Sequence, residues 1–469
     1  YYEKAIAINP DYSKAHFNLG CTFQELGQLD ASAKSFEKVL IIEPDYAEAH
    51  NNLGIALKDL RQLDASIKSF EKAIAIKPDY VEAHYSLGTS LQELGQLEEA
   101  VKSYEAVLVI KPDLAEIHNN LGVILNKLNQ KDAALKSLER AVAIKPDYAE
   151  AHFNLGDTLR ELGQLETAIK SYEKVIAIKP DYADAFNNLG IAHMDLGQRD
   201  KAVKCYEKAL SINPNFAEAH NNLGNVLKTL GQFDAAIKNY EKVLAINPNY
   251  VDVYNNLGIT YMDLGQQDKA VKCYEQALTI NPDFADAHNT LGIAHINLGQ
   301  LDMAVKCYEK ALAINPDYVE AHNNLSIALT DLGKLDEALI SCGNASMLKP
   351  DFEYIFGTTL NTKMKLCIWN NLTKHLDELT NKINNNKKVI TPFCMLGLID
   401  DPELQRKVAA IQTIDKFPKN HDLPRIGQYL KHKKIRIGYF SADFRNHPVA
   451  DLTAELYELH DRSQFEIHA

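Results

Sequence analysis

The chain has 469 residues, too many for one compact core, so its length favours several domains or an elongated repeat array. Hydrophobic residues (46%) and charged residues (24%) are as frequent as in soluble proteins, and no apolar run reaches the roughly 20 residues of a membrane-spanning helix. Residues 1–352 hold 33 Lys and Arg against 49 Asp and Glu, a net charge of −16 that disfavours nucleic acid as a partner.

Prolines recur every 34 residues from Pro10 to Pro350 without an insertion or deletion. If each proline takes position 32 of a repeat, ten complete repeats cover residues 13–352, and residues 1–12 end a partial repeat. Glycine at position 15 in eight repeats predicts the end of a first helix, and the proline stops a second helix. Tyr1 then falls inside a second helix, so we expect that the protein is truncated at its N-terminus.

Small and large residues alternate within each predicted hairpin. Position 8 is glycine in nine repeats, position 20 is Ala or Ser in all ten, and position 24 is Phe or Tyr in eight. We interpret this pattern as core packing, with the aromatic ring filling the space beside the small residues, rather than as a ligand-binding stripe.

These residues match the pattern of the tetratricopeptide repeat family, and the resemblance covers residues 1–352. It implies an all-α, right-handed superhelix in which the first helices line the concave face.

Position 6 of the predicted first helix is asparagine in eight repeats, although asparagine has a poor propensity for the middle of a helix. These residues are Asn18, Asn52, Asn120, Asn154, Asn188, Asn222, Asn256 and Asn324. A side-chain amide offers donors and an acceptor, so a row of amides can pair with the backbone of an extended segment of a protein substrate in the concave groove. An alternative stays open: the amides bond neighbouring repeats to each other.

Position 13, on the same helix face, is acidic in seven repeats, among them Asp59, Asp195 and Asp263. We expect these carboxylates to contact basic or hydroxyl-bearing residues of the bound segment. Histidine at position 4 in eight repeats is expected to pack near the seam between repeats, because one histidine per repeat lacks the convergent ligands of a metal site.

The seven cysteines show no CxxC pair and no Cys/His ligand spacing. We therefore expect buried, reduced thiols, no bound metal and a cytoplasmic protein. Self-association into a homo-oligomer is compatible with the sequence.

Residues 353–430 predict a helical linker, helical around Trp369 up to about residue 384, with another helix after Asp401 and Pro402. Residues 431–469 then predict a strand at 435–440, a loop, a helix opened by Pro448 and a strand from Phe465. Strand, helix and parallel strand form the first unit of an α/β lobe, and two short strands bury too little surface alone. We expect an incomplete, Rossmann-like lobe.

Residues 434–467 resemble the start of the catalytic region of protein O-linked N-acetylglucosaminyltransferases, on the run Ile435–Pro448 and on Asp461–Glu466. The resemblance implies metal-free, inverting transfer of N-acetylglucosamine from UDP-GlcNAc, a donor substrate rather than a cofactor, to Ser or Thr of proteins. His447 matches the histidine of the family's His-Pro motif and is the candidate catalytic residue. The second, nucleotide-binding lobe of the family is absent, so we expect this chain alone to be inactive.

Two other functions remain compatible with the sequence. Protein O-fucosyltransferases share this architecture and use a guanosine diphosphate donor. A non-catalytic tetratricopeptide scaffold that binds other proteins would need no α/β lobe after the array.

Overall fold

The computed structural model describes residues 1–416, 435–438 and 465–468. The chain divides into two compact units, residues Tyr1–Lys349 and Pro350–Ala469, and each is treated separately below.

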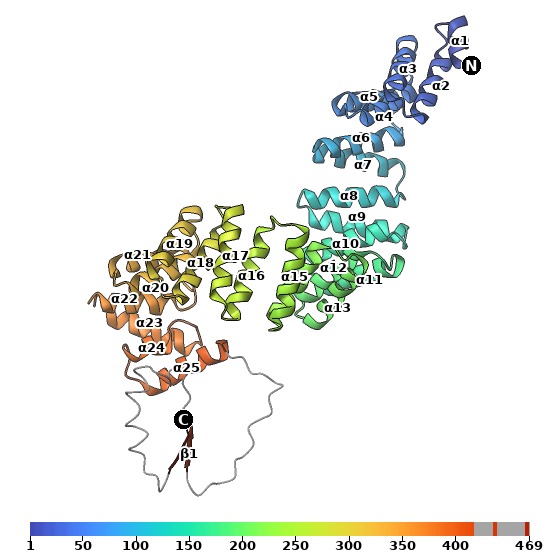
Figure 1. Cartoon of the computed structure of the whole chain (residues 1–469). Helices are drawn as coiled ribbons and strands as arrows, with labels where there is room; N and C mark the ends of the chain where they lie inside the picture. Colours follow the sequence, from blue (N-terminus) through green and yellow to red (C-terminus); the bar gives the residue numbers. More distant parts are fainter. Residues whose placement is uncertain (417–434, 439–464, 469) are drawn as a thin grey trace. The chain divides into compact units, whose positions relative to one another are not determined.

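The first unit consists of helices that follow the predicted repeat (Figure 1). Helix α1 (Tyr2–Ile8) is the second helix of the partial repeat. The first helices of the ten repeats are α2 (Ser13–Glu25), α4 (Ala47–Asp59), α6 (Val81–Leu94), α8 (Ala115–Lys127), α10 (Ala149–Glu161), α12 (Ala183–Asp195), α14 (Ala217–Thr229), α16 (Val251–Asp263), α18 (Ala285–Asn297) and α20 (Val319–Asp331). The second helices are α3 (Leu29–Ile42), α5 (Leu63–Ile76), α7 (Leu97–Ile110), α9 (Lys131–Ile144), α11 (Leu165–Ile178), α13 (Arg199–Ile212), α15 (Phe233–Ile246), α17 (Gln267–Ile280), α19 (Leu301–Ile314) and α21 (Leu335–Leu348).

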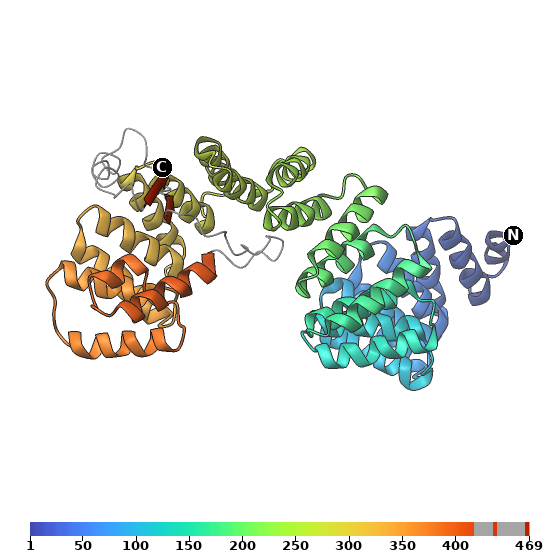
Figure 2. The same cartoon turned by 90° about the horizontal axis from the view of Figure 1, so that it is seen from below.

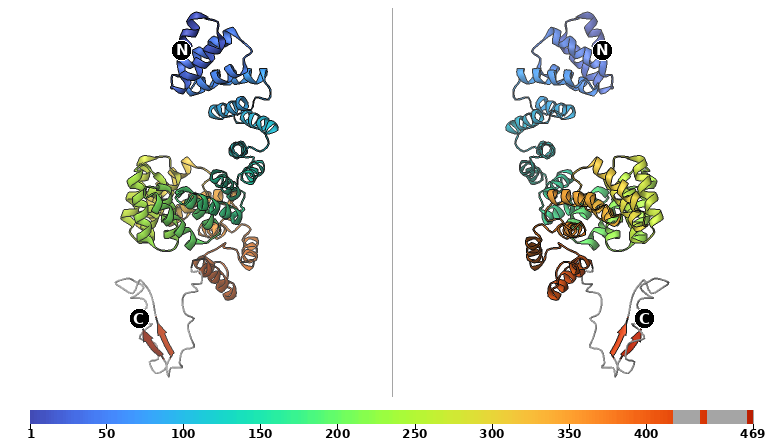
Figure 3. Two further views of the ribbon diagram at one scale, coloured as in Figure 1. Left: turned by 90° about the vertical axis from the view of Figure 1, so that its right-hand side faces the viewer. Right: turned by 90° about the vertical axis from the view of Figure 1, so that its left-hand side faces the viewer.

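Each hairpin packs on the next in chain order, as Figures 2 and 3 show from further sides. First helices also contact the first helices of neighbouring repeats, for example α8 with α10 and α16 with α18, whereas second helices of neighbouring repeats contact each other much less within the described array. First helices therefore lie on the shorter, inner side of the curved array. The predicted helical superhelix is confirmed.

The aromatic ring at position 24 lies directly on the glycine backbone at position 8 of the same repeat. A Cβ atom on Gly156 would lie 2.6 Å from Cε1 of Tyr172, and one on Gly20 would lie 2.8 Å from Cε1 of Phe36. Tyr172 and Phe36 are both fully buried. The stripe of aromatic residues is therefore core, as predicted, and glycine is required where the ring meets the first helix.

The turn inside each hairpin requires a left-handed residue at position 15. Eight repeats place glycine there, with φ between 70° and 84°. The two exceptions keep the same conformation, because Arg61 has φ 61° and Asn129 has φ 59°. A side chain is unfavourable in this region, less so for asparagine than for arginine.

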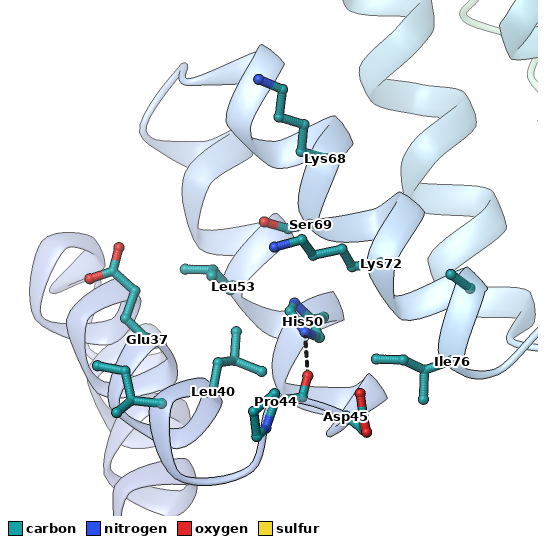
Figure 4. A pocket seen from close by; sticks show the side chains of 12 residues that line it. Glu37, Leu40, Pro44, Asp45, His50, Leu53, Lys68, Ser69, Lys72 and Ile76 are labelled. Carbon is teal, nitrogen blue, oxygen red and sulfur yellow. Dashed lines mark hydrogen bonds between the residues drawn. The ribbon is translucent and has the colours of Figure 1, made fainter.

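The histidine at position 4 closes the seam between successive repeats. In all eight repeats that carry it, Nε2 donates to the carbonyl oxygen of the preceding position-32 proline, at 2.9 Å for His50 and Pro44 (Figure 4) and 3.0 Å for His288 and Pro282. Burial lowers the pKa of His50 and of His288, which favours the neutral ring.

The second unit opens with four helices, α22 (Ile355–Lys365), α23 (Leu372–Asn384), α24 (Pro392–Leu396) and α25 (Pro402–Lys416). The predicted helix around Trp369 is interrupted, because Cys367 and Asn371 have φ 56° and 60° and the chain turns between α22 and α23. The helix predicted after Asp401 is present, and the Asp401 carboxylate accepts from the backbone N–H of Glu403 at 2.9 Å.

Strand β1 (Ile435–Gly438) pairs in parallel with β2 (Phe465–His468). Both lie where strands were predicted. The predicted helix at Pro448 lies outside the described residues, so the larger α/β lobe stays a prediction.

Replacement of Arg61 by glycine tests the turn. We expect Arg61→Gly to raise the melting temperature of the array, with a gain of about 1 kcal/mol, because glycine adopts the left-handed conformation without the steric cost of a side chain. Thermal unfolding followed by circular dichroism measures the melting temperature. Arg61 loses only an exposed ion pair with Glu93 at 3.7 Å.

Asn129→Gly is the matched control and should gain less, since asparagine tolerates positive φ. A fall in melting temperature for Arg61→Gly would contradict this explanation of position 15.

Candidate functional site

The candidate site is the row of asparagine side chains at positions 5 and 6 of the first helices, named here the amide band. All eight predicted position-6 asparagines are half-buried on the helices that form the inner side of the array. Five of them, Asn52, Asn154, Asn188, Asn222 and Asn324, donate a side-chain hydrogen bond to the preceding repeat.

Three of these bonds link one amide to another. Nδ2 of Asn154 donates to Oδ1 of Asn119 at 2.9 Å, and the same bond joins Asn222 to Asn187 and Asn324 to Asn289, both at 3.0 Å. The acceptor is the position-5 asparagine of the preceding repeat. The alternative that the amides bond neighbouring repeats is therefore correct for their NH₂ groups.

Two other position-6 amides use position 9 of the preceding repeat as acceptor. Asn188 donates to Oδ1 of Asp157 at 2.9 Å, and Asn52 donates more weakly to Sγ of Cys21 at 3.7 Å. Asn18, Asn120 and Asn256 form no amide-to-amide bond within the described array.

The direction of these bonds decides what the amide band can offer. In Asn154, Asn222 and Asn324 one N–H of the NH₂ group is used inside the array, while the carbonyl oxygen accepts no hydrogen bond from the described part of the chain. One of the two donors expected of each of these three amides is therefore taken up within the array, and the acceptor is kept. The band presents acceptors, which suit N–H and O–H donors.

Sequence reasoning missed position 5, which carries half of the amide band. Buried Oδ1 atoms of Asn51, Asn221 and Asn323 have no hydrogen-bond partner in the described structure. For Asn51 a reason is visible, because the next repeat places Ser86 where other repeats place a longer asparagine. The recurring Asn-Asn pair, as at 51–52 and 221–222, was the signal available in the sequence.

The acidic residues at position 13 are exposed and differ in their partners. Asp195 lies 3.9 Å from the guanidinium of Arg160, in the preceding repeat. Asp59 and Asp263 form no ion pair within the described residues. Exposed ion pairs are weak, so these carboxylates all stay accessible to a positively charged partner.

Asp157 is the most unusual group of the surface. Its carboxylate accepts from Oη of Tyr172 at 2.6 Å and from Asn188 at 2.9 Å. Burial raises the pKa of Asp157 above the usual range of an aspartate, although both hydrogen bonds favour the charged form. A half-buried carboxylate thus stands in the middle of the amide band.

The described residues give little support for thiol or metal chemistry. Burial raises the pKa of Cys205 and of Cys273 to about 11, so these thiols stay protonated and unreactive near neutral pH. Among residues 1–416 no cluster of His, Cys, Asp and Glu could hold a metal ion, and no helix there is long and apolar enough to cross a membrane. His447 lies outside the described residues.

Stacked 34-residue hairpins whose first helices carry a polar band define a helical-repeat protein suited to binding other proteins. Family models agree with this class. Models described as "TPR repeat" match residues 22–60, 56–95, 90–129, 124–159, 156–197, 190–231, 224–265 and 260–299, and models described as "Tetratricopeptide repeat" match 1–33, 285–318 and 307–340. The chain belongs to the tetratricopeptide repeat family.

Individual relatives match only in part. A probable UDP-N-acetylglucosamine–peptide N-acetylglucosaminyltransferase SEC of Arabidopsis thaliana is 30% identical over 126 residues, 23% of this chain and 13% of that protein. YrrB, described as a TPR protein with an unusual peptide-binding site, is 28% identical with a TM-score of 0.37 over 40% of this chain and 96% of its own. MamA is 33% identical with a TM-score of 0.33 over 34% of this chain and 95% of its own.

Replacement of Asp157 by asparagine tests the cost of the buried carboxylate. Asparagine at the same position of repeat seven, Asn225, accepts the tyrosine hydroxyl of Tyr240 at 2.8 Å, so Asp157→Asn keeps this bond. A raised pKa means that the ionised form is penalised on folding, a penalty present above the folded pKa and relieved as pH falls through it. We expect Asp157→Asn to melt at a higher temperature than the wild type at pH 7, and the difference to shrink towards pH 4.

Asp195→Asn, which changes an exposed carboxylate, is the control and should show no such trend. Lower stability of Asp157→Asn at pH 7 would contradict the proposed cost of burial.

Proposed function

We propose that the array binds extended segments of partner proteins along the amide band. The supporting observation is the orientation of the position-6 amides, whose NH₂ groups bond the preceding repeat and whose carbonyl oxygens in Asn154, Asn222 and Asn324 keep their acceptor capacity. An extended backbone presents an N–H group at every residue except proline, so a row of acceptors grips it with little dependence on side chains.

The net charge of the array indicates which protein segments it binds best. The array carries a net charge of −16, and Asp59 and Asp263 are exposed without an ion pair in the described residues. Segments that contain Lys or Arg are favoured over acidic ones, and their association should weaken as salt screens the charges.

Removal of several position-6 amides tests the proposal. The probe is a fluorescent 15-residue peptide selected on the wild-type chain from a random library. We expect the triple change of Asn154, Asn222 and Asn324 to alanine to weaken its binding at least tenfold, since each lost hydrogen bond contributes about 0.5–1.5 kcal/mol. Fluorescence anisotropy measures the affinity, and circular dichroism verifies that helicity is kept.

The control carries the same number of alanines on the second helices, at the exposed Lys170, Lys204 and Lys238. It should bind the peptide with near wild-type affinity at high salt. Equal affinity of the triple asparagine variant and this control would overturn the proposal.

We propose in addition that the chain is the protein-binding part of a protein O-N-acetylglucosaminyltransferase. Three observations support this assignment: the run Ile435–Pro448 with its His-Pro motif at His447, the parallel pairing of β1 with β2, and the similarity of the repeats to the plant N-acetylglucosaminyltransferase. In this proposal the array delivers substrates and His447 acts at the donor and acceptor. A protein O-fucosyltransferase and a non-catalytic scaffold are the alternatives.

The product of the complete reading frame distinguishes the three functions. It should transfer N-acetylglucosamine from UDP-GlcNAc to Ser or Thr of a peptide bound by the array, with at least a hundredfold loss in His447→Ala, measured by mass spectrometry. Transfer from GDP-fucose would replace the assignment by the fucosyltransferase. If neither donor supports transfer, the non-catalytic scaffold becomes the favoured function.

A further inference from the structure

The residue at position 34, just before each first helix, is aromatic at ten of its eleven occurrences from residue 12 to residue 352. Leu114 is the exception. An aromatic side chain at this position packs into the junction between repeats, and its burial raises the pKa of Tyr80 to about 12. Leu114 leaves part of the equivalent space empty.

The same repeat is unusual at position 5, where three repeats place an aromatic ring instead of asparagine. In two of them the ring meets the position-34 ring of the same repeat: Phe17 stacks on Tyr46 with centroids 5.1 Å apart, and Phe153 lies 5.4 Å from Tyr182. In the third, Tyr85 faces the position of Leu114. Tyr85 is 37% exposed, whereas Phe17 and Phe153 are half-buried.

A cavity of about 610 Å³ opens at this place, between repeats three and four. Its apolar walls are Tyr85, Leu114, Ile117 and Ile144. Volumes of several hundred Å³ are typical of sites that hold a ligand group. Tyr85 stands at position 5, which is asparagine in seven other repeats, so the cavity includes a residue of the first-helix face that carries the amide band.

The rim of the cavity is charged. Asp113 is already paired with Arg140 at 2.6 Å, and Lys145 lies 5.0 Å from the ring centroid of Tyr148. Glu82, Glu116 and Lys111 also line the rim and form no ion pair within the described array, so two carboxylates there face the two ammonium groups of Lys111 and Lys145. The two unpaired carboxylates can hold a cation, and the net charge of −16 of the array favours a positively charged neighbour for an apolar group.

We propose that this cavity anchors one large aliphatic or aromatic side chain of the bound segment, with a Lys or Arg beside it held by Glu82 and Glu116. The inference rests on the proposed binding of extended segments and adds a specificity pocket to it. The amide band grips the backbone, and the cavity sets the register of the segment along the array. Burial of an apolar group in the cavity between Tyr85 and Leu114 is favourable, because it removes apolar surface from water.

Filling the cavity tests this inference. Leu114→Tyr installs the residue that most other repeats carry, so we expect an unchanged or higher melting temperature, and Leu114→Phe serves as a second variant. Random 15-residue libraries selected on the wild type should enrich a Trp, Phe or Leu next to Lys or Arg. A selected peptide should lose at least tenfold affinity for Leu114→Tyr, as expected for one large buried side chain.

The second half of the experiment is a double-mutant cycle. Replacing the apolar anchor of the peptide by alanine should weaken binding to the wild type and leave binding to Leu114→Tyr unchanged. The control Phe216→Tyr alters position 34 of another repeat and should bind like the wild type.

If Leu114→Tyr binds every selected peptide with wild-type affinity, the proposed anchoring cavity is wrong. The proposed binding of extended segments along the amide band would still stand. Loss of self-association in Leu114→Tyr, seen by sedimentation with unchanged peptide binding, would also overturn it, because a second copy would then occupy the cavity. If the wild type selects no peptide, the proposed function itself fails.

Discussion

The contact on which the array depends is that of the position-24 ring with the glycine backbone at position 8. It sets the distance between the two helices in the eight repeats that carry the ring, since a ring such as that of Tyr172 leaves no room for a Cβ atom on Gly156. Repeat ten shows the same constraint in reverse. Ser326 replaces the glycine and the smaller Cys342 replaces the ring, and both are fully buried.

Uniform hairpins stack with a constant offset, and this offset creates the surface chemistry. Position 6 of one repeat reaches position 5 of the preceding one, so the amides bond each other along the array. The bond takes up one N–H of the NH₂ group and leaves the oxygen of Asn154, Asn222 and Asn324 without a donor from the described residues. The repeated stacking of the hairpins thereby places hydrogen-bond acceptors at intervals along the array. The proposed binding of extended segments rests on these acceptors.

Much of the fold was predictable, because prolines, glycines and aromatic residues act through local geometry. The turns at Gly27 and Gly95 and the seam histidines followed from spacing alone. The partners of the amides did not follow, since they depend on the offset between repeats, which no single repeat encodes. Asp157 was missed because its acceptor role requires Tyr172 and Asn188 from two different repeats. The cavity at Leu114 was missed for a similar reason: its significance appears only when the ring of Tyr85 is compared with those of Phe17 and Phe153, which meet an aromatic ring at position 34.

The central claim is that a guest polypeptide lies along the first helices and is held by the side-chain amides. A crystal structure of the chain with a selected peptide tests this claim most directly. We expect backbone N–H groups of the peptide within hydrogen-bond distance of Oδ1 of Asn154, Asn222 or Asn324. A peptide seated instead between second helices, in the outer pocket beside His50 and Lys72 (Figure 4), would contradict the account.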